Sequence, residues 1–409
     1  MTSTAPAARA RSAAAAALCF AMLAAAPARA QQPTHEVNWF PVVGGDSDIG
    51  LGAGIVGDWA RFGPVPPGID WRADTAAFIS FKLQNGKLVI PFTDIWVELL
   101  VPRWRAGGRL HLDARLSFTN EQTLKYTGIG NASPPFPSDL TLIEYARLHP
   151  TASTEVRVRV TDVFFLLAGA SLTYNHLDVP ANTVLAMQQA AGPPDVRELL
   201  GNFDPHGVAL FTAEAQFDTR DDESVTTRGQ FHTLRLRGSP HVGGAFPYGY
   251  ERATLTARFY GIPLGLGFDL RLRLAGDVLF GDAPFYELAR FDETAAIGGG
   301  KAVRGVPAQR YYGKVKAFGN LEVTRSLWAF SLWKKPCVLG IEGFFDTGRT
   351  WTELGQSHPE LDGTGLGLKY GVGGGLRLLE GRTFIVRLEI AWSPDASPVG
   401  AYFAAGQLF

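Results

Sequence analysis

The chain has 409 residues, of which 46% are hydrophobic, and its 38 basic and 39 acidic residues give a formal net charge of −1. This composition is typical of a folded protein with ample apolar surface and excludes a disordered polar chain. The balance of charge argues against a nucleic-acid partner, which would favour a basic excess.

Residues 1–30 have the pattern of a cleaved export signal. Arg9 and Arg11 form a basic start, residues 13–26 are apolar, and Ala28-Arg29-Ala30 matches an A-x-A cleavage site. The apolar run of about 14 residues is shorter than the roughly 20 that a membrane-spanning helix needs. We therefore expect a signal peptide over 1–30 and one β-barrel domain over 31–409.

Beyond residue 30 the chain alternates between apolar and polar residues. Leu234 and Leu236 alternate with Arg235 and Arg237, and the same pattern recurs over 270–274. These runs reach about 9 to 12 residues, the length of a tilted transmembrane strand. In such a barrel the arginines face a wet lumen and the aliphatic residues face lipid. The pattern predicts an all-β transmembrane barrel.

Seventeen segments show this alternation, and a barrel with both ends on one side of the membrane needs an even number. We predict 16 antiparallel strands and expect the surplus segment in the region 139–160. Long connections at 119–138, 175–205, 280–312 and 349–365 are expected to be extracellular loops. The predicted segments are 36–44, 49–60, 71–83, 88–100, 109–118, 139–147, 151–160, 163–174, 206–217, 229–238, 250–260, 267–279, 313–325, 337–346, 366–378, 382–392 and 400–409.

The chain ends in GAYFAAGQLF, an alternating segment that closes on an aromatic residue. This ending is typical of outer-membrane barrels, in which it serves as the address for assembly. We expect Phe403 and Phe409 to act as the targeting signal. The expected location is the bacterial outer membrane, with its lipid and the barrel assembly machinery as partners during biogenesis.

The segment KAVRGVPAQRYYGK, residues 301–314, is a cationic interruption within the expected loop 280–312. A loop folded into a lumen loses water, so its charge needs a partner. A guanidinium held by two carboxylate oxygens is directional as well as charged. Gly305 permits close approach to the wall, and Pro307 stiffens the chain after it. Arg304 alone could equally be one more lumen or solvated arginine.

Several motifs together resemble the outer-membrane assembly-factor superfamily, the bacterial surface antigen group of BamA-like and TamA-like barrels. In order they are FPVVGGDSDIGLGAG at 40–54, FDTRDDESVTTRGQ at 217–230, Val303-Arg304-Gly305, and Phe344-Phe345-Asp346-Thr347-Gly348. The resemblance implies that the loop after the eleventh strand folds into the lumen and that its arginine meets the aspartate of the thirteenth strand.

The site expected from this resemblance is a structural latch in the lumen. Its members are Arg304, Gly305, Asp346 and Gly348, and its secondary loop contacts are Val303, Arg310, Tyr311 and Tyr312. Family members that assemble or export proteins carry periplasmic polypeptide-transport-associated domains. Here the first strand begins within about ten residues of the expected cleavage site. The client-binding part is therefore expected to be absent or to be a separate periplasmic protein.

Two functions follow from the sequence, and a third is disfavoured. The first is assistance to protein insertion into, or translocation across, the outer membrane; the alternative is a passive channel plugged by the loop 280–312. An enzyme is not expected, because Gly45-Asp46-Ser47 has no Asp-x-x-His near the C-terminus to supply a base. The eight histidines show no metal-ligand spacing, and Cys337 is the only cysteine after residue 30, so neither a cofactor nor a metal is expected.

Overall fold

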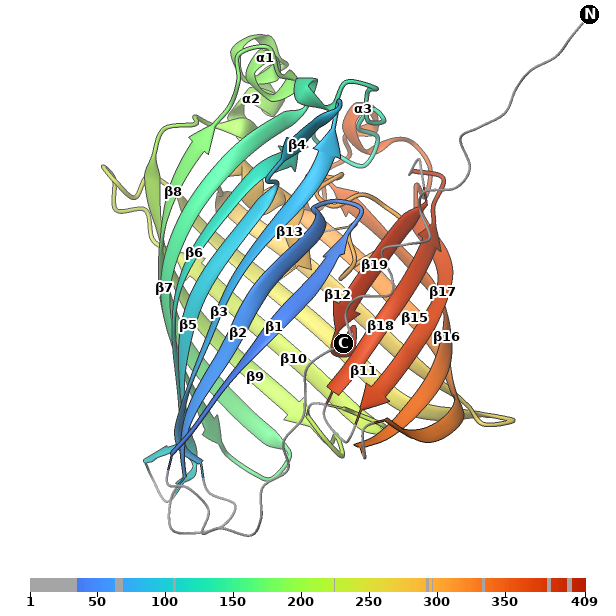
Figure 1. Cartoon of the computed structure of the whole chain (residues 1–409). Coiled ribbons are helices and arrows are strands. Elements are labelled where there is room, and N and C mark those ends of the chain that lie inside the picture. Colours follow the sequence, from blue (N-terminus) through green and yellow to red (C-terminus); the bar gives the residue numbers. More distant parts are fainter. Residues whose placement is uncertain are drawn as a thin grey trace, which may run out of the picture.

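The computed structural model describes residues 35–62, 69–105, 108–223, 225–291, 294–295, 297–332, 335–380, 384–395 and 399–409. Within these ranges, 16 antiparallel strands form a sheet that closes on itself by pairing its first strand with its last. Figure 1 shows the resulting barrel. The predicted fold class and strand number are confirmed, while the expected signal peptide lies outside the described residues.

Each barrel strand pairs with its neighbour in the chain, as in a meander. The strands are β1 (His35–Asp46), β2 (Gly50–Phe62), β3 (Ile69–Gln84), β5 (Phe92–Arg105), β6 (Leu110–Lys125), β7 (Glu144–Arg159), β8 (Phe164–Asp178), β9 (His206–Asp218), β10 (Gly229–Ser239), β11 (Gly249–Gly265), β12 (Phe268–Asp282), β15 (Val315–Leu332), β16 (Lys335–Trp351), β17 (Lys369–Glu380), β18 (Phe384–Trp392) and β19 (Gly400–Ala405). Short β4 (Lys87–Val89) pairs antiparallel with the end of β3, and β13 (Arg290–Phe291) pairs with β14 (Thr294–Ala295).

The two faces of the wall differ as the alternation predicts. On β12, Leu274 is 50% exposed on the outside, while Arg271 and Arg273 are buried on the inside. Leu234, Leu236 and Leu255 likewise lie exposed on the outer face. A lipid-facing outer surface and a charged interior follow from this period of two.

The surplus segment predicted between 139 and 160 arises from a proline. Predicted segments 139–147 and 151–160 form one strand, β7, with Pro150 in its middle. Pro150 pairs with Phe118 of β6, but the register toward β8 skips from Leu148 to Thr151. Proline has no N–H to donate on that side, which explains the interruption in the pattern.

Other predicted boundaries also need correction. The segment 88–100 divides at Pro91 into β4 and β5, and β6 continues to Lys125, beyond the predicted end at 118. The last strand stops at Ala405, so the predicted strand 400–409 is too long. The tail after it turns inward, since Gln407 Nε2 donates to Thr226 O at 2.9 Å.

The long connections gather at one end of the barrel, here called the loop end, which sequence analysis assigns to the outside. They hold α1 (Val184–Ala191), α2 (Pro194–Leu200), α3 (Pro359–Asp362) and the 3₁₀ turns η2 (Leu140–Leu142) and η3 (Phe285–Ala289). An apolar cluster that includes Tyr126, Leu185 and Phe285 packs beneath them. None of the helices in the described ranges is long and apolar enough to span a membrane.

Candidate functional site

The connection between β12 and β15, residues 283–314, enters the barrel and is called here the luminal loop. Its residues Ala302, Val303, Arg304, Val306, Tyr311 and Tyr312 have no exposed surface. The loop follows the eleventh barrel strand, as the resemblance implies. Burying a guanidinium so completely is unfavourable unless carboxylates compensate for its lost hydration.

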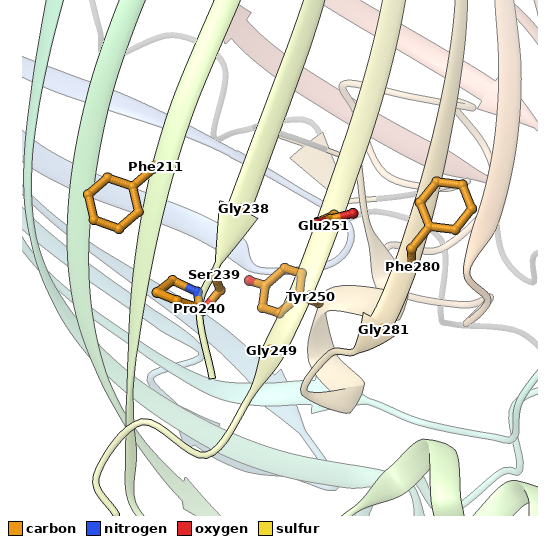
Figure 2. A pocket seen from close by; sticks show the side chains of 9 residues that line it. All are labelled: Phe211, Gly238, Ser239, Pro240, Gly249, Tyr250, Glu251, Phe280 and Gly281. Carbon is orange, nitrogen blue, oxygen red and sulfur yellow. The ribbon is translucent and has the colours of Figure 1, made fainter. Parts of the chain in front are cut away.

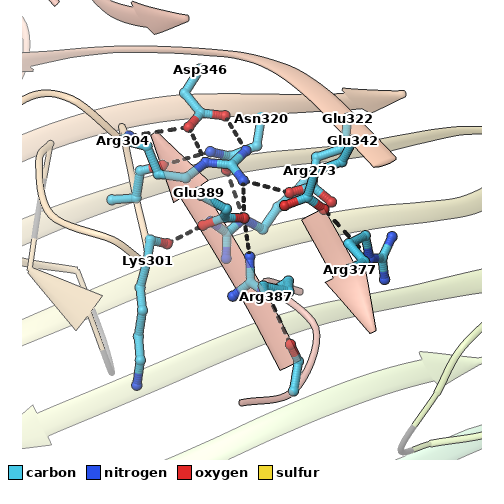
Figure 3. Close-up of polar contacts among 12 residues, drawn as sticks. Arg273, Lys301, Arg304, Asn320, Glu322, Glu342, Asp346, Arg377, Arg387 and Glu389 are labelled. Carbon is cyan, nitrogen blue, oxygen red and sulfur yellow. Dashed lines mark hydrogen bonds and ion pairs between the residues drawn. The ribbon is translucent and has the colours of Figure 1, made fainter. Parts of the chain in front are cut away.

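Arg304 meets Asp346 on β16, the thirteenth barrel strand, in a bidentate pair (Figure 3). Arg304 Nε donates to Asp346 Oδ2 at 2.7 Å and Nη2 donates to Oδ1 at 2.9 Å. The backbone N–H of Arg304 donates to Oδ2 at 3.1 Å. This fork geometry fixes both position and direction, which a lysine could not do.

Two further carboxylates complete the surroundings of Arg304. Its Nη1 donates to Glu322 Oε1 on β15 at 2.8 Å and to Glu389 Oε1 on β18 at 2.9 Å. The guanidinium carbon also lies 3.5 Å from the ring centroid of Phe344, a cation–π contact. We call these five residues the Arg304 cluster. It joins the loop to three strands of the wall.

The sequence reasoning did not identify Glu322 and Glu389. Both are acidic residues at inward positions of alternating strands, in GNLEV and RLEIA, and this was the signal that could have revealed them. The nearby Glu342 has no hydrogen-bond partner among the described residues but lies 3.4 Å from Arg377 Nε. Although Glu322, Glu342 and Glu389 bring oxygens within 4.8 Å of one another, arginines already neutralise them, so they form an ion-pair network rather than a metal centre.

Three glycines let the loop approach the wall. Gly305 has φ +93°, and its N–H donates to Tyr402 Oη on β19 at 2.8 Å. A Cβ on Gly348 would lie 2.6 Å from Ile297 Cδ1 of the loop. A Cβ on Gly371 of β17 would lie 1.7 Å from Arg304 O. Gly371 was not foreseen, because its role depends on a strand that is distant in sequence.

The predicted secondary residues all contact the interior. Val303 packs in an apolar cluster with Ile297, Val306 and Phe318. The remaining three make polar contacts: Arg310 Nη1 with Thr127 Oγ1 at 2.7 Å and Ser133 Oγ at 2.9 Å, Tyr311 Oη with Asp395 Oδ1 at 2.8 Å, and Tyr312 Oη with Lys125 O at 2.8 Å. The loop is therefore held along its length, and not at Arg304 alone.

The beginning of the loop is fixed by a second ionic group. Arg252 Nη1 lies 3.0 Å from Glu287 Oε2 in η3, and Lys316 Nζ lies 3.0 Å from Asp277. Burial alone would raise the pKa of Glu287, but the positive charges of Arg252, Arg290 and Arg147 outweigh it and lower the pKa to about 2. Glu287 is thus an ionised anchor where the loop leaves β12.

The junction of the first and last strands, called here the seam, is short. β1 and β19 pair only at Gly45 with Phe403 and at Asp46 with Tyr402, whereas β1 pairs with β2 along its whole length. One further bond runs from Ser47 N to Ala401 O at 3.2 Å. The rest of β1 leaves its edge unpaired toward β19 within the described residues.

The luminal loop also touches the turn that ends β1. Ala308 N donates to Asp48 Oδ2 at 3.1 Å, and Lys125 Nζ lies 3.8 Å from Asp48 Oδ1. Asp46 Oδ1 accepts from the N–H groups of Asp48 and Ile49, so Asp46 caps this turn. With Tyr402 bound to Gly305, the loop contacts both sides of the seam.

The two terminal aromatic residues lie in different places. Phe403 is 36% exposed and pairs at the seam. Phe409 lies inside, with its ring centroid 6.1 Å from that of Tyr260 and 5.0 Å from the guanidinium carbon of Arg273. Their targeting role stays a prediction, because it concerns the chain before the barrel closes.

A groove of about 540 Å³ lies on the outer wall, where β10, β11 and β12 reach the loop end (Figure 2). The register places Phe211, Gly238, Glu251 and Phe280 in one row across β9 to β12. Glu251 and Phe280 are exposed, and Gly238 leaves the space between the side chains open. This groove belongs to the outer face and does not share residues with the Arg304 cluster.

Comparison with known proteins identifies the family. Residues 92–409 match the model of the Omp85 superfamily domain, and no curated protein matches the chain. Among solved structures, BamA from Haemophilus ducreyi lacking POTRA domains 1–3 is similar, with a TM-score of 0.59 and 12% identity over 91% of this chain and 70% of that chain.

CdiB from Escherichia coli is also similar, with a TM-score of 0.54 and 12% identity over 92% of this chain and 64% of that one. CdiB from Acinetobacter baumannii has a TM-score of 0.51 and 11% identity over 92% of this chain and 60% of that chain. At sequence identities of 11 to 12%, the similarity to these structures shows a shared fold alone. Since the family model covers most of the barrel and the whole Arg304 cluster, the chain belongs to the Omp85 superfamily, whose barrels are outer-membrane assembly and transport proteins rather than enzymes.

Proposed function

We propose that this barrel assists the insertion of proteins into, or their translocation across, the outer membrane by opening at the seam. The observation that carries the proposal is that, among the residues that the structure describes, β1 pairs with β19 at two positions only. An unpaired strand edge presents free N–H and C=O groups, which can pair with an incoming strand. A client strand added to β1 would form hydrogen bonds with backbone N–H and C=O groups of β1, which lipid tails cannot do.

The luminal loop gives this opening a means of control. Gly305 binds Tyr402 on β19, and Ala308 binds Asp48 beside β1. The Arg304 cluster holds that loop on β15, β16 and β18. We infer that a loop fixed by Arg304 restrains the two seam strands, so that loop position and seam opening are coupled.

A passive channel would need a continuous aqueous path. The luminal loop occupies the interior near the loop end, and at the other end Thr226, which lies between β9 and β10, is turned inward, with its carbonyl oxygen bound by Arg271 and Gln407. Opening such a path would break the buried pairs of Arg304, at about 3 to 5 kcal/mol for one stranded charge. These contacts favour a function at the seam, by strand pairing, over passive conduction through the lumen.

The proposal can be tested by locking the seam. Gly44→Cys with Ala404→Cys lies one step along the register from the observed pairs, and Gly44 has room for a side chain. Cys337 is buried and is the only other cysteine after residue 30. Purified protein in liposomes would be given a urea-unfolded eight-stranded outer-membrane barrel, and client folding would be followed by protease protection.

We expect client folding to be several-fold faster than in protein-free liposomes, to fall to that background when the disulfide forms, and to recover on reduction. The matched control is Ala53→Cys with Ile79→Cys, which joins two fully paired strands. Equal rates with and without the protein, or equal rates for locked and reduced seams, contradict the proposal. Large steady conductance in planar bilayers, unchanged by Arg304→Ala, would support the channel instead.

A further inference from the structure

Two of the connections that cover the loop end meet at a cluster of metal-ligating side chains. Asp195 lies on α2, between β8 and β9, while His358 precedes α3 and Glu360 lies on it, between β16 and β17. One ligand atom from each of these residues lies within 4.8 Å of the other two. The cluster therefore joins two connections that are six strands apart in the 16-stranded barrel.

The side chains of His358 and Glu360 lie close together, at a distance that suits an ion pair and also two ligands of one ion. His358 Nδ1 lies 3.5 Å from Glu360 Oε1, and no hydrogen bond joins the two in the described structure. Around a tetrahedral ion with bonds near 2.0 to 2.1 Å, two ligand atoms are separated by about 3.4 Å. The observed separation is thus close to the span of two ligands that share one metal ion.

The other ring nitrogen also has the surroundings of a metal-bound imidazole. His358 Nε2 is shielded from solvent and has no hydrogen-bond partner among the described residues. Glu353 Oε2 lies 3.8 Å from it, and Lys314 Nζ holds Glu353 Oε1 at 3.1 Å. A ligating histidine usually donates its second N–H to a carboxylate, which fixes its tautomer. Glu353 is placed for that role.

We propose that Asp195, His358 and Glu360 bind a divalent first-row transition-metal ion, with Glu353 as the outer carboxylate and water completing the coordination. Imidazole and carboxylate together suit ions such as Zn²⁺, whereas Ca²⁺ and Mg²⁺ prefer oxygen ligands alone. The ion would also offset the repulsion among three carboxylates. Its structural effect would be to tie α2 to α3 over the end of the lumen.

The test uses the purified full-length barrel in detergent, stripped of metal with a chelator and titrated with Zn²⁺ by calorimetry. We expect one saturable site, and an affinity at least tenfold lower in His358→Gln and Asp195→Asn. Glu198→Gln is the matched control, because it removes an exposed acid from the same helix outside the cluster. Its affinity should equal that of the unaltered chain.

A second readout separates a metal site from a structural role of His358. Hydrogen exchange should slow in both α2 and α3 when Zn²⁺ is added to the unaltered chain, and this slowing should be lost in Glu360→Gln. Absence of a saturable Zn²⁺ site, unchanged affinity in both ligand variants, or equally tight binding of Mg²⁺ would overturn the proposal. The outcome is independent of the seam, because client folding is not measured.

Discussion

Arg304 and Asp346 form a bidentate ion pair inside the barrel, at 2.7 and 2.9 Å, and both side chains are completely buried. Glu322 and Glu389 both accept from the remaining guanidinium nitrogen, Nη1. The arginine is therefore the one cation that touches all three carboxylates among the contacts described. Any change to it strands several charges at once.

Replacing Arg304 by alanine should release the luminal loop. Stranding a buried charge costs about 3 to 5 kcal/mol, and here three carboxylates lose a partner. We expect the free energy of unfolding in urea to fall by about that amount, and hydrogen exchange over residues 301–313 to become faster. The control is Lys301→Ala, whose side chain is exposed and points away from the cluster in Figure 3.

The bond between Gly305 and Tyr402 should contribute to seam closure. Tyr402→Phe removes the acceptor for the Gly305 N–H and leaves the ring in place. A single hydrogen bond contributes about 1 kcal/mol, so hydrogen exchange of β19 should quicken about fivefold. Tyr370→Phe serves as the comparison, since its hydroxyl makes no hydrogen bond in the described structure. If hydrogen exchange of β19 were equally fast in the two variants, the bond between Gly305 and Tyr402 would not contribute to seam closure.

The barrel could be predicted because its alternation is local. The inward arginines and outward leucines of β10 and β12 are read from neighbouring residues, and the position of the loop followed from ordered motifs. The surroundings of Arg304 could not be predicted in full. Glu322, Glu389 and Gly371 meet the loop because the curved sheet of consecutive strands β15 to β18 wraps around a loop that folds into the lumen. Their separation along the chain carries no signal of that contact.

The anchor at Glu287 should give the barrel a defined response to acid. Its pKa of about 2 lies below the ordinary 4.5, so its stabilising effect is complete above pH 4.5 and is lost as the pH falls toward 2. Glu287→Gln should lower the free energy of unfolding at pH 7 by on the order of 3 kcal/mol. The difference should shrink steadily between pH 4.5 and 2.

The comparison variant for this measurement is Glu198→Gln, which alters an exposed acid at the same end of the barrel. Its effect on the free energy of unfolding should be small at every pH. A difference between Glu287→Gln and the unaltered chain that persists undiminished at pH 2 would mean that the carboxylate charge is not what anchors the loop.

Gly371 provides a steric test of the loop position that leaves every charge in place. An alanine Cβ there would lie 1.7 Å from Arg304 O, so either the loop or β17 must move. Because β17 is paired on both sides, we expect the loop to yield, with faster hydrogen exchange over 301–313 and a reduced free energy of unfolding. Gly276→Ala on β12, where a Cβ meets nothing within 4 Å, should change neither quantity. If Gly371→Ala left the exchange of the loop unchanged, the close contact between β17 and Arg304 would not exist in the folded protein.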